Sequence, residues 1–113
     1  MKVLVLDDGR KRIVQMQDEL GKKNIETVLC STSNSFMDAV GTANFDSFLI
    51  NVDTWEKGRA IYDYFGIGRK IEQKPVIFYN ADETFTSVNN RIPNDKDQVL
   101  YKPVDIDAVV GAL

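Results

Sequence analysis

Histidine is absent from the 113 residues, and cysteine occurs once, as Cys30. The absence of histidine excludes a histidine-based catalytic triad, and with a single cysteine it also excludes a zinc site built from these two residue types. One cysteine cannot form an internal disulfide. The sequence therefore carries no mark of an oxidising compartment, and we expect a cytoplasmic protein.

Long apolar runs and basic stripes are also missing. The first apolar run, Val3-Leu4-Val5-Leu6, ends at Asp7 and is too short for a signal peptide or a membrane span. The net charge of −3 gives no reason to expect a surface for nucleic acid. With 43% hydrophobic residues, a chain of this length predicts one domain over residues 1–113 with one proper core.

What the sequence does contain is an alternation of short apolar runs with segments of helical spacing. This alternation is typical of βα units around a parallel sheet. The continuous apolar runs indicate strands buried on both faces. The five predicted strands cover residues 2–6, 26–30, 48–50, 76–79 and 99–101.

The intervening segments predict helices on both faces of that sheet. The first should end at Gly21, with an apolar stripe that includes Val14 and Met16. Cap candidates at 31–35 and at Asp105 begin two others. The remaining two are marked by apolar positions at Ala60, Ile61, Tyr64, Phe65, Phe85 and Val88, and the one with Phe85 and Val88 follows the cap candidate Asp82.

Polar side chains follow four of the five strands. In an open parallel sheet the ligand site lies beyond the carboxyl ends of the strands, so these side chains are the candidate site. Two adjacent carboxylates repel each other unless a cation compensates them, and Mg²⁺ with a phosphate group and a lysine would do so. Capping of the next helix is the structural alternative for the acidic pair. The five residues are Asp7, Asp8, Asn51, Asn80 and Lys102.

Four motifs in this order resemble a receiver domain, the response-regulator module of two-component signalling, over essentially the whole chain. They are Leu-Asp-Asp at 6–8, Asp46 before an apolar strand, Pro-Val-Ile at 75–77, and Lys-Pro-Val-Asp at 102–105. The resemblance implies a flavodoxin-like fold, a doubly wound five-stranded parallel sheet in the order 2-1-3-4-5. It also implies a signalling protein rather than an enzyme.

The resemblance assigns roles by position. Asp7 and Asp8 match the Mg²⁺-binding acidic pair of the family, and Lys102 matches the lysine that holds the phosphoryl group. Pro103 matches a proline that usually follows a cis peptide bond. The phosphorylated aspartate of the family is replaced by Asn51, which weakens any Mg²⁺ site because an amide oxygen is neutral.

Three further positions depart from the family pattern. Asn80 stands where the family has a switching serine or threonine, and Val99 stands where an aromatic switch residue is common. Trp55 replaces a usual proline, and it is either a contact for a partner or a cover for the loop after the third strand. These losses predict a receiver that has lost phosphotransfer and works through protein contacts.

Two other functions stay open. In the first, Asp53 is the phosphoacceptor of a working receiver, because it also lies just beyond the third apolar run. In the second, the chain binds a small ligand or a nucleotide, although no glycine-rich phosphate loop follows the first strand. The partners that the receiver reading implies are a histidine kinase, an output domain or another signalling protein, with a homodimer as a further option.

A small basic run, Arg10-Lys11-Arg12, adjoins the acidic pair. We interpret it as the solvated first turn of a helix, in preference to a phosphate-binding group.

Overall fold

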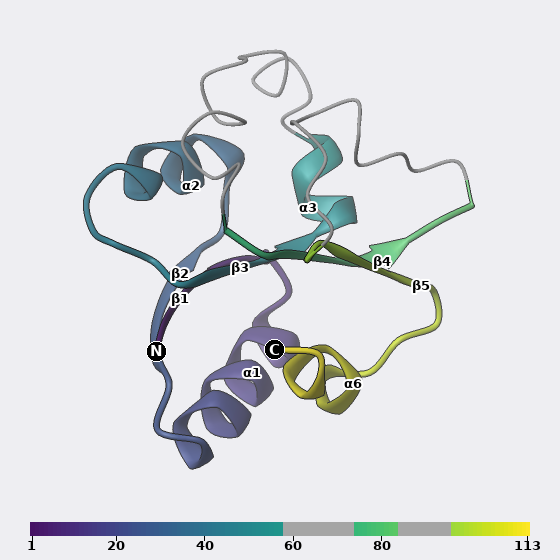
Figure 1. Ribbon diagram of the computed structural model, residues 1–113. Helices are drawn as coiled ribbons and strands as arrows, with labels where there is room; N and C mark the ends of the chain where they lie inside the picture. The colour runs from purple at the N-terminus through teal and green to yellow at the C-terminus, as the bar shows by residue number, and fades with distance from the viewer. Residues whose placement is uncertain (58–73, 84–95) are drawn as a thin grey trace.

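The predicted parallel sheet is present in the computed structural model, which describes residues 1–57, 74–83 and 96–113 (Figure 1). All strand pairs are parallel, and the strand order is β2-β1-β3-β4-β5. This confirms the doubly wound, flavodoxin-like order 2-1-3-4-5. The strands are β1 (Lys2–Leu6), β2 (Glu26–Cys30), β3 (Ser47–Asn51), β4 (Val76–Ala81) and β5 (Gln98–Tyr101).

Helices cover both faces of the sheet. Figure 1 shows α1 and α6 on one face and α2 and α3 on the other. Their bounds are α1 (Arg10–Lys22), α2 (Ser33–Val40), α3 (Val52–Lys57) and α6 (Ile106–Gly111). The helices predicted around Ala60 to Phe65 and around Phe85 lie outside the described residues. Within the described ranges, no helix is both long enough and apolar enough to cross a membrane.

Two helix starts follow the predicted caps. The side chain of Thr32 accepts a hydrogen bond from the backbone amide of Ser35, and the Ser35 hydroxyl oxygen accepts one from the backbone amide of Thr32, which is a capping box. Asp105 accepts a bond from the amide of Ala108 at 2.9 Å and so caps α6. Local sequence therefore satisfies backbone amides at both helix starts.

Two details of α1 correct the sequence prediction. The helix does not end at Gly21 but continues to Lys22, and the chain then reverses at Asn24, whose φ of 58° is the left-handed conformation that asparagine tolerates. Val14 is 58% exposed and does not belong to the buried stripe. Met16 and Leu20 form that stripe, because they share the face of α1 that meets the sheet.

The sheet separates two apolar cores. One core lies under α2 and α3 and contains Trp55, which is 3% exposed. The Trp55 ring makes T-shaped contacts with Phe36 and Phe78, with centroids 6.2 and 6.3 Å apart. Trp55 is therefore a packing residue that covers the sheet after β3. The second core lies under α1 and α6, and the candidate site continues from it.

Candidate functional site

The site begins where three central strands point side chains toward α1 and α6. Val5, Leu49 and Ile77 belong to the core on that face. Successive side chains of a strand alternate between faces, so the residues two positions further along return to the same face. These residues are Asp7, Asn51 and Tyr79, and the sheet register places Asn51 directly beside Tyr79.

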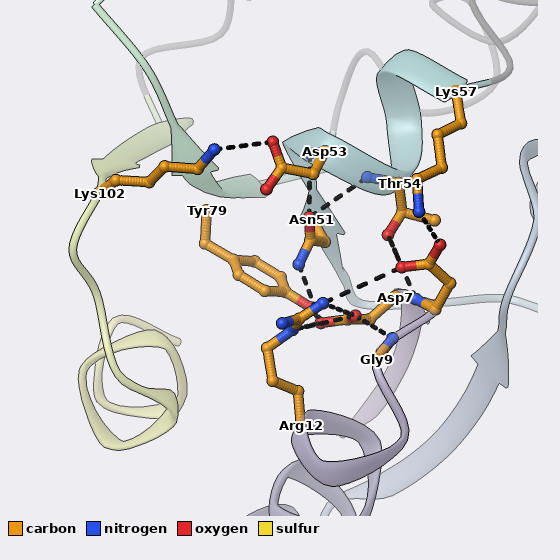
Figure 2. A network of polar contacts seen from close by, with 10 residues as sticks. Asp7, Gly9, Arg12, Asn51, Asp53, Thr54, Lys57, Tyr79 and Lys102 are labelled. Carbon is orange, nitrogen blue, oxygen red and sulfur yellow. Dashed lines mark hydrogen bonds and ion pairs between the residues drawn. The ribbon is translucent and has the colours of Figure 1, made fainter.

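Asp7 is the centre of the resulting network, with 1% of its surface exposed (Figure 2). Its Oδ1 accepts hydrogen bonds from the amide of Gly9 at 2.8 Å and from Nη2 of Arg12 at 3.0 Å. Its Oδ2 accepts bonds from Tyr79 at 2.7 Å, from Asn51 at 3.1 Å and from Nε of Arg12 at 3.0 Å. Both oxygens of this buried carboxylate are therefore satisfied by hydrogen bonds.

Contact with Asp7 raises the pKa of two of its hydrogen-bond partners, Arg12 and Tyr79. The hydrogen bond to Asp7 raises the pKa of the Arg12 guanidinium, so Arg12 is a permanent cation at this site. Burial raises the pKa of the Tyr79 hydroxyl far above its usual value, and the nearby Asp7 charge raises it further. Tyr79 is thus a neutral donor, and Arg12 and Asp7 form an ion pair.

Asn51 uses both ends of its amide. The side chain is fully buried. Its oxygen accepts hydrogen bonds from the backbone amides of Asp53 at 2.9 Å and Thr54 at 3.3 Å, which lie in the first turn of α3. Its nitrogen donates to Asp7. A carboxylate could replace the acceptor but not the donor, so this position suits asparagine better than aspartate.

Asp8 faces away from Asp7, toward α3. Its carboxylate accepts a hydrogen bond from the Thr54 hydroxyl at 2.9 Å. The backbone amide of Asp8 donates a hydrogen bond to the same hydroxyl oxygen at 3.2 Å. Lys57 donates to the other carboxylate oxygen, and this bond is the main cause of the lowered pKa of Asp8. The predicted acidic pair is therefore divided between two sets of partners, and Arg12 lies between them, with Nη2 3.9 Å from Asp8.

Lys102 pairs with Asp53 and not with Asn51. Its ammonium donates to the Asp53 carboxylate at 2.9 Å, and this bond raises the pKa of Lys102. Both side chains are about half exposed, at 47% and 45%. Figure 2 shows this pair on the opposite side of Asn51 from Arg12. The expected cis peptide bond before Pro103 is present.

Asn80 stands apart from the network. Its φ is 58°, and the pairing of β4 with β5 shifts register between Tyr79 and Ala81. Asparagine is one of the few residues that adopt this left-handed conformation readily. Within the part of the chain that the structure describes, no hydrogen bond joins the Asn80 side chain to Asn51 or Lys102. The position is explained by backbone shape.

A divalent ion does not fit at Asp7, because hydrogen-bond donors already surround its carboxylate. A carboxylate offers about four lone pairs, and five hydrogen-bond donors already approach the two oxygens of Asp7. The Asn51 oxygen is taken by two backbone amides. Among the described residues, no three histidine, cysteine, aspartate or glutamate side chains gather closely enough to hold a metal ion. The predicted Mg²⁺ site would require Arg12 to move.

Sequence reasoning misses four members of the network. The pattern predicts a solvated Arg12, but its guanidinium returns to the buried Asp7. Tyr79 is predicted only as part of a strand, and the pattern gives no role to Thr54 or Lys57. The alternation of β4 offers one signal, because a tyrosine at the end of a buried strand needs a partner for its hydroxyl.

Comparison with solved structures places this geometry in a known fold. No protein family matches by sequence, and no curated protein sequence matches either. A response regulator from Burkholderia pseudomallei, solved with a phosphorylated aspartic acid, calcium ion and citrate, superimposes with a TM-score of 0.75. It shares 14% identity over 99% of this chain and 65% of its own chain.

A second solved structure decides the fold. The chemotaxis response regulator CheY4 of Vibrio cholerae gives a TM-score of 0.71 at 14% identity, over 97% of this chain and 92% of its own. The chain has the fold of a receiver domain. A streptococcal redox sensor evolved from two-component response regulators also has this receiver fold, with a TM-score of 0.71 and 18% identity, over 97% of this chain and 48% of its own. The chain thus spans less than two thirds of the Burkholderia and streptococcal proteins.

Proposed function

We propose that the chain is an atypical receiver-like domain of two-component signal transduction, which is not phosphorylated at Asn51 and acts through protein–protein contacts. Three similar structures with the receiver fold support the signalling class. The buried hydrogen bonding of Asn51 carries the atypical part of the proposal. The domain is a binding module rather than an enzyme, and it is cytoplasmic.

The chemistry of the site supports the loss of phosphotransfer. Capture of a phosphoryl group needs an ionised carboxylate oxygen with access to a donor. The Asn51 oxygen is neutral, fully buried and already bonded to two amides. Lys102, which would steady a phosphoryl group, is directed to Asp53.

The partner is a protein of the same signalling class: a histidine kinase, an output domain, another signalling protein or a second copy of this chain. A nucleotide is a poorer candidate ligand. The loop after β1 presents Asp7 and Asp8 where a nucleotide phosphate would need backbone amides, and like charges repel.

One observation favours a second candidate function, phosphorylation on Asp53. This carboxylate is 45% exposed, and it is the group that Lys102 contacts. An exposed aspartate beside a lysine has both the nucleophile and the positive charge that a phosphoryl group needs. Against it, the carboxylate that would hold the metal ion for this reaction, Asp7, is already paired with Arg12.

Incubation with Mg²⁺ and acetyl phosphate, followed by intact-mass spectrometry, distinguishes the two functions. We expect no phosphoryl mass increment on the wild-type protein or on the variant Asp53→Asn, because neither Asn51 nor a metal-assisted carboxylate is available. A wild-type adduct that disappears in Asp53→Asn would overturn the proposal in favour of phosphorylation on Asp53.

A further inference from the structure

The first turn of α1 has an unusual charge distribution. Arg10, Lys11 and Arg12 occupy it, and the turn contains no acidic residue. The positive end of the helix dipole lies at this terminus, so three cations there are unfavourable unless an anion compensates them. Arg12 has that anion, because its guanidinium contacts Asp7 through Nε at 3.0 Å and through Nη2 at 3.0 Å.

Arg12 also bridges the two carboxylates of the strand end. Its Nη2 lies 3.0 Å from Oδ1 of Asp7 and 3.9 Å from Oδ1 of Asp8. A positive group at this point is attracted to both carboxylates, one buried and one 30% exposed. This is also the position from which a small hard cation could reach oxygens of both residues.

Gly9 provides the space for this contact. A Cβ atom at residue 9 would lie 2.4 Å from Nη2 and 2.5 Å from Cζ of Arg12. The φ of Gly9 is −86°, which any residue can adopt, so backbone conformation does not require glycine here. The close approach of the guanidinium does require it.

From these contacts we propose that Arg12 is a built-in cation of the Asp7 site, which takes the position of a divalent ion and makes the site independent of metal. The inference does not rest on the proposed function, because it concerns only which cation neutralises Asp7 and Asp8. It implies that the acidic pair Asp7 and Asp8 is kept, while the arginine excludes the divalent ion.

The test measures Mn²⁺ binding by electron paramagnetic resonance in four proteins, the wild type and three variants. Arg12→Ala removes the cation, and Arg12→Gln removes the charge but keeps an amide that can donate a hydrogen bond to Asp7. Lys11→Ala is the matched control, since it removes a charge from the same helical turn without touching Asp7. We expect Arg12→Ala and Arg12→Gln to bind Mn²⁺ at least about tenfold more tightly than the wild type and Lys11→Ala do.

Each result decides the proposal. If Arg12→Ala fails to fold because Asp7 loses its partner, the folded Arg12→Gln protein gives the answer by itself. Tighter Mn²⁺ binding that is removed again by adding Asp7→Asn supports a built-in cation. Equal binding by Arg12→Gln, Lys11→Ala and the wild type would overturn it, and so would tight wild-type binding that depends on Asp7.

Discussion

Asn51→Asp is expected to lower the free energy of unfolding at pH 7 by about 3 kcal/mol or more, the range observed when a buried charge is left without compensation. The new carboxylate would replace the amide nitrogen that now lies 3.1 Å from Oδ2 of Asp7. Two buried carboxylates at that distance cannot both ionise without a large cost. A change that places an aspartate at position 51 is therefore predicted to damage the fold.

Urea denaturation measures this effect, and pH separates its cause. In the variant, repulsion between Asp7 and the new carboxylate raises the folded-state pKa of the pair above the unfolded value, so the loss should be small near pH 4 and grow as pH rises. Asn34→Asp is the control, at an exposed position in α2, and should change stability by no more than about 0.5 kcal/mol. An Asn51→Asp protein as stable as the wild type at pH 7 would contradict the proposed network.

Tyr79→Phe is expected to have two effects, one at neutral pH and one at alkaline pH. At neutral pH it removes a 2.7 Å hydrogen bond to a buried carboxylate, which should cost about 1.5–3 kcal/mol. At alkaline pH the variant should lose less stability than the wild type. The reason is that the pKa of Tyr79, whose usual value is 10.0, is strongly raised in the folded protein by burial.

The sign of the alkaline effect follows from proton binding. Above pH 10.0 the unfolded tyrosine releases its proton while folded Tyr79 keeps it, so stability present below pH 10.0 is lost as pH rises. One such group contributes about 1.4 kcal/mol per pH unit. Urea denaturation between pH 8 and pH 11 should therefore show the curves of wild type and Tyr79→Phe converging. Tyr101→Phe, at a tyrosine that is 53% exposed, is the control and should keep the wild-type decline; parallel curves for Tyr79→Phe would refute the burial argument.

The sheet could be predicted from sequence because its signals are local. Each strand is a short apolar run, and each run needs cover on two faces, which only a parallel α/β arrangement with alternating helices supplies. The caps at Thr32 and Asp105 are equally local, since they involve residues three positions apart. The prediction that Val14 belongs to the buried stripe is wrong, because apolar residues at helical spacing do not show where the buried face of a helix ends.

Strand polarity predicts where the candidate residues lie, but not which of them pair. Asp7, Asp8, Asn51 and Lys102 end or directly follow their strands and so lie at the carboxyl edge of the sheet. Which cation meets which carboxylate depends on side-chain reach and on space, and neither is visible in spacing alone. Arg12 contacts Asp7 because Gly9 leaves room, and Lys102 contacts Asp53 because Asn51 offers no charge.

The residues around the Asp7 carboxylate therefore form one connected network. Asn51, Arg12 and Tyr79 each donate a hydrogen bond to the buried carboxylate of Asp7. Changes at Asn51, Arg12 and Tyr79 should consequently be coupled, because all three act on the same carboxylate.

The most direct test of the metal-independent site is a crystal structure of the wild-type protein grown with Mg²⁺ and beryllofluoride. We predict that Arg12 stays hydrogen bonded to Asp7, with no ion on that carboxylate and no beryllofluoride on Asn51 or Asp53. A Mg²⁺ ion held by Asp7 and Asp8, with the Arg12 guanidinium displaced, would contradict this prediction.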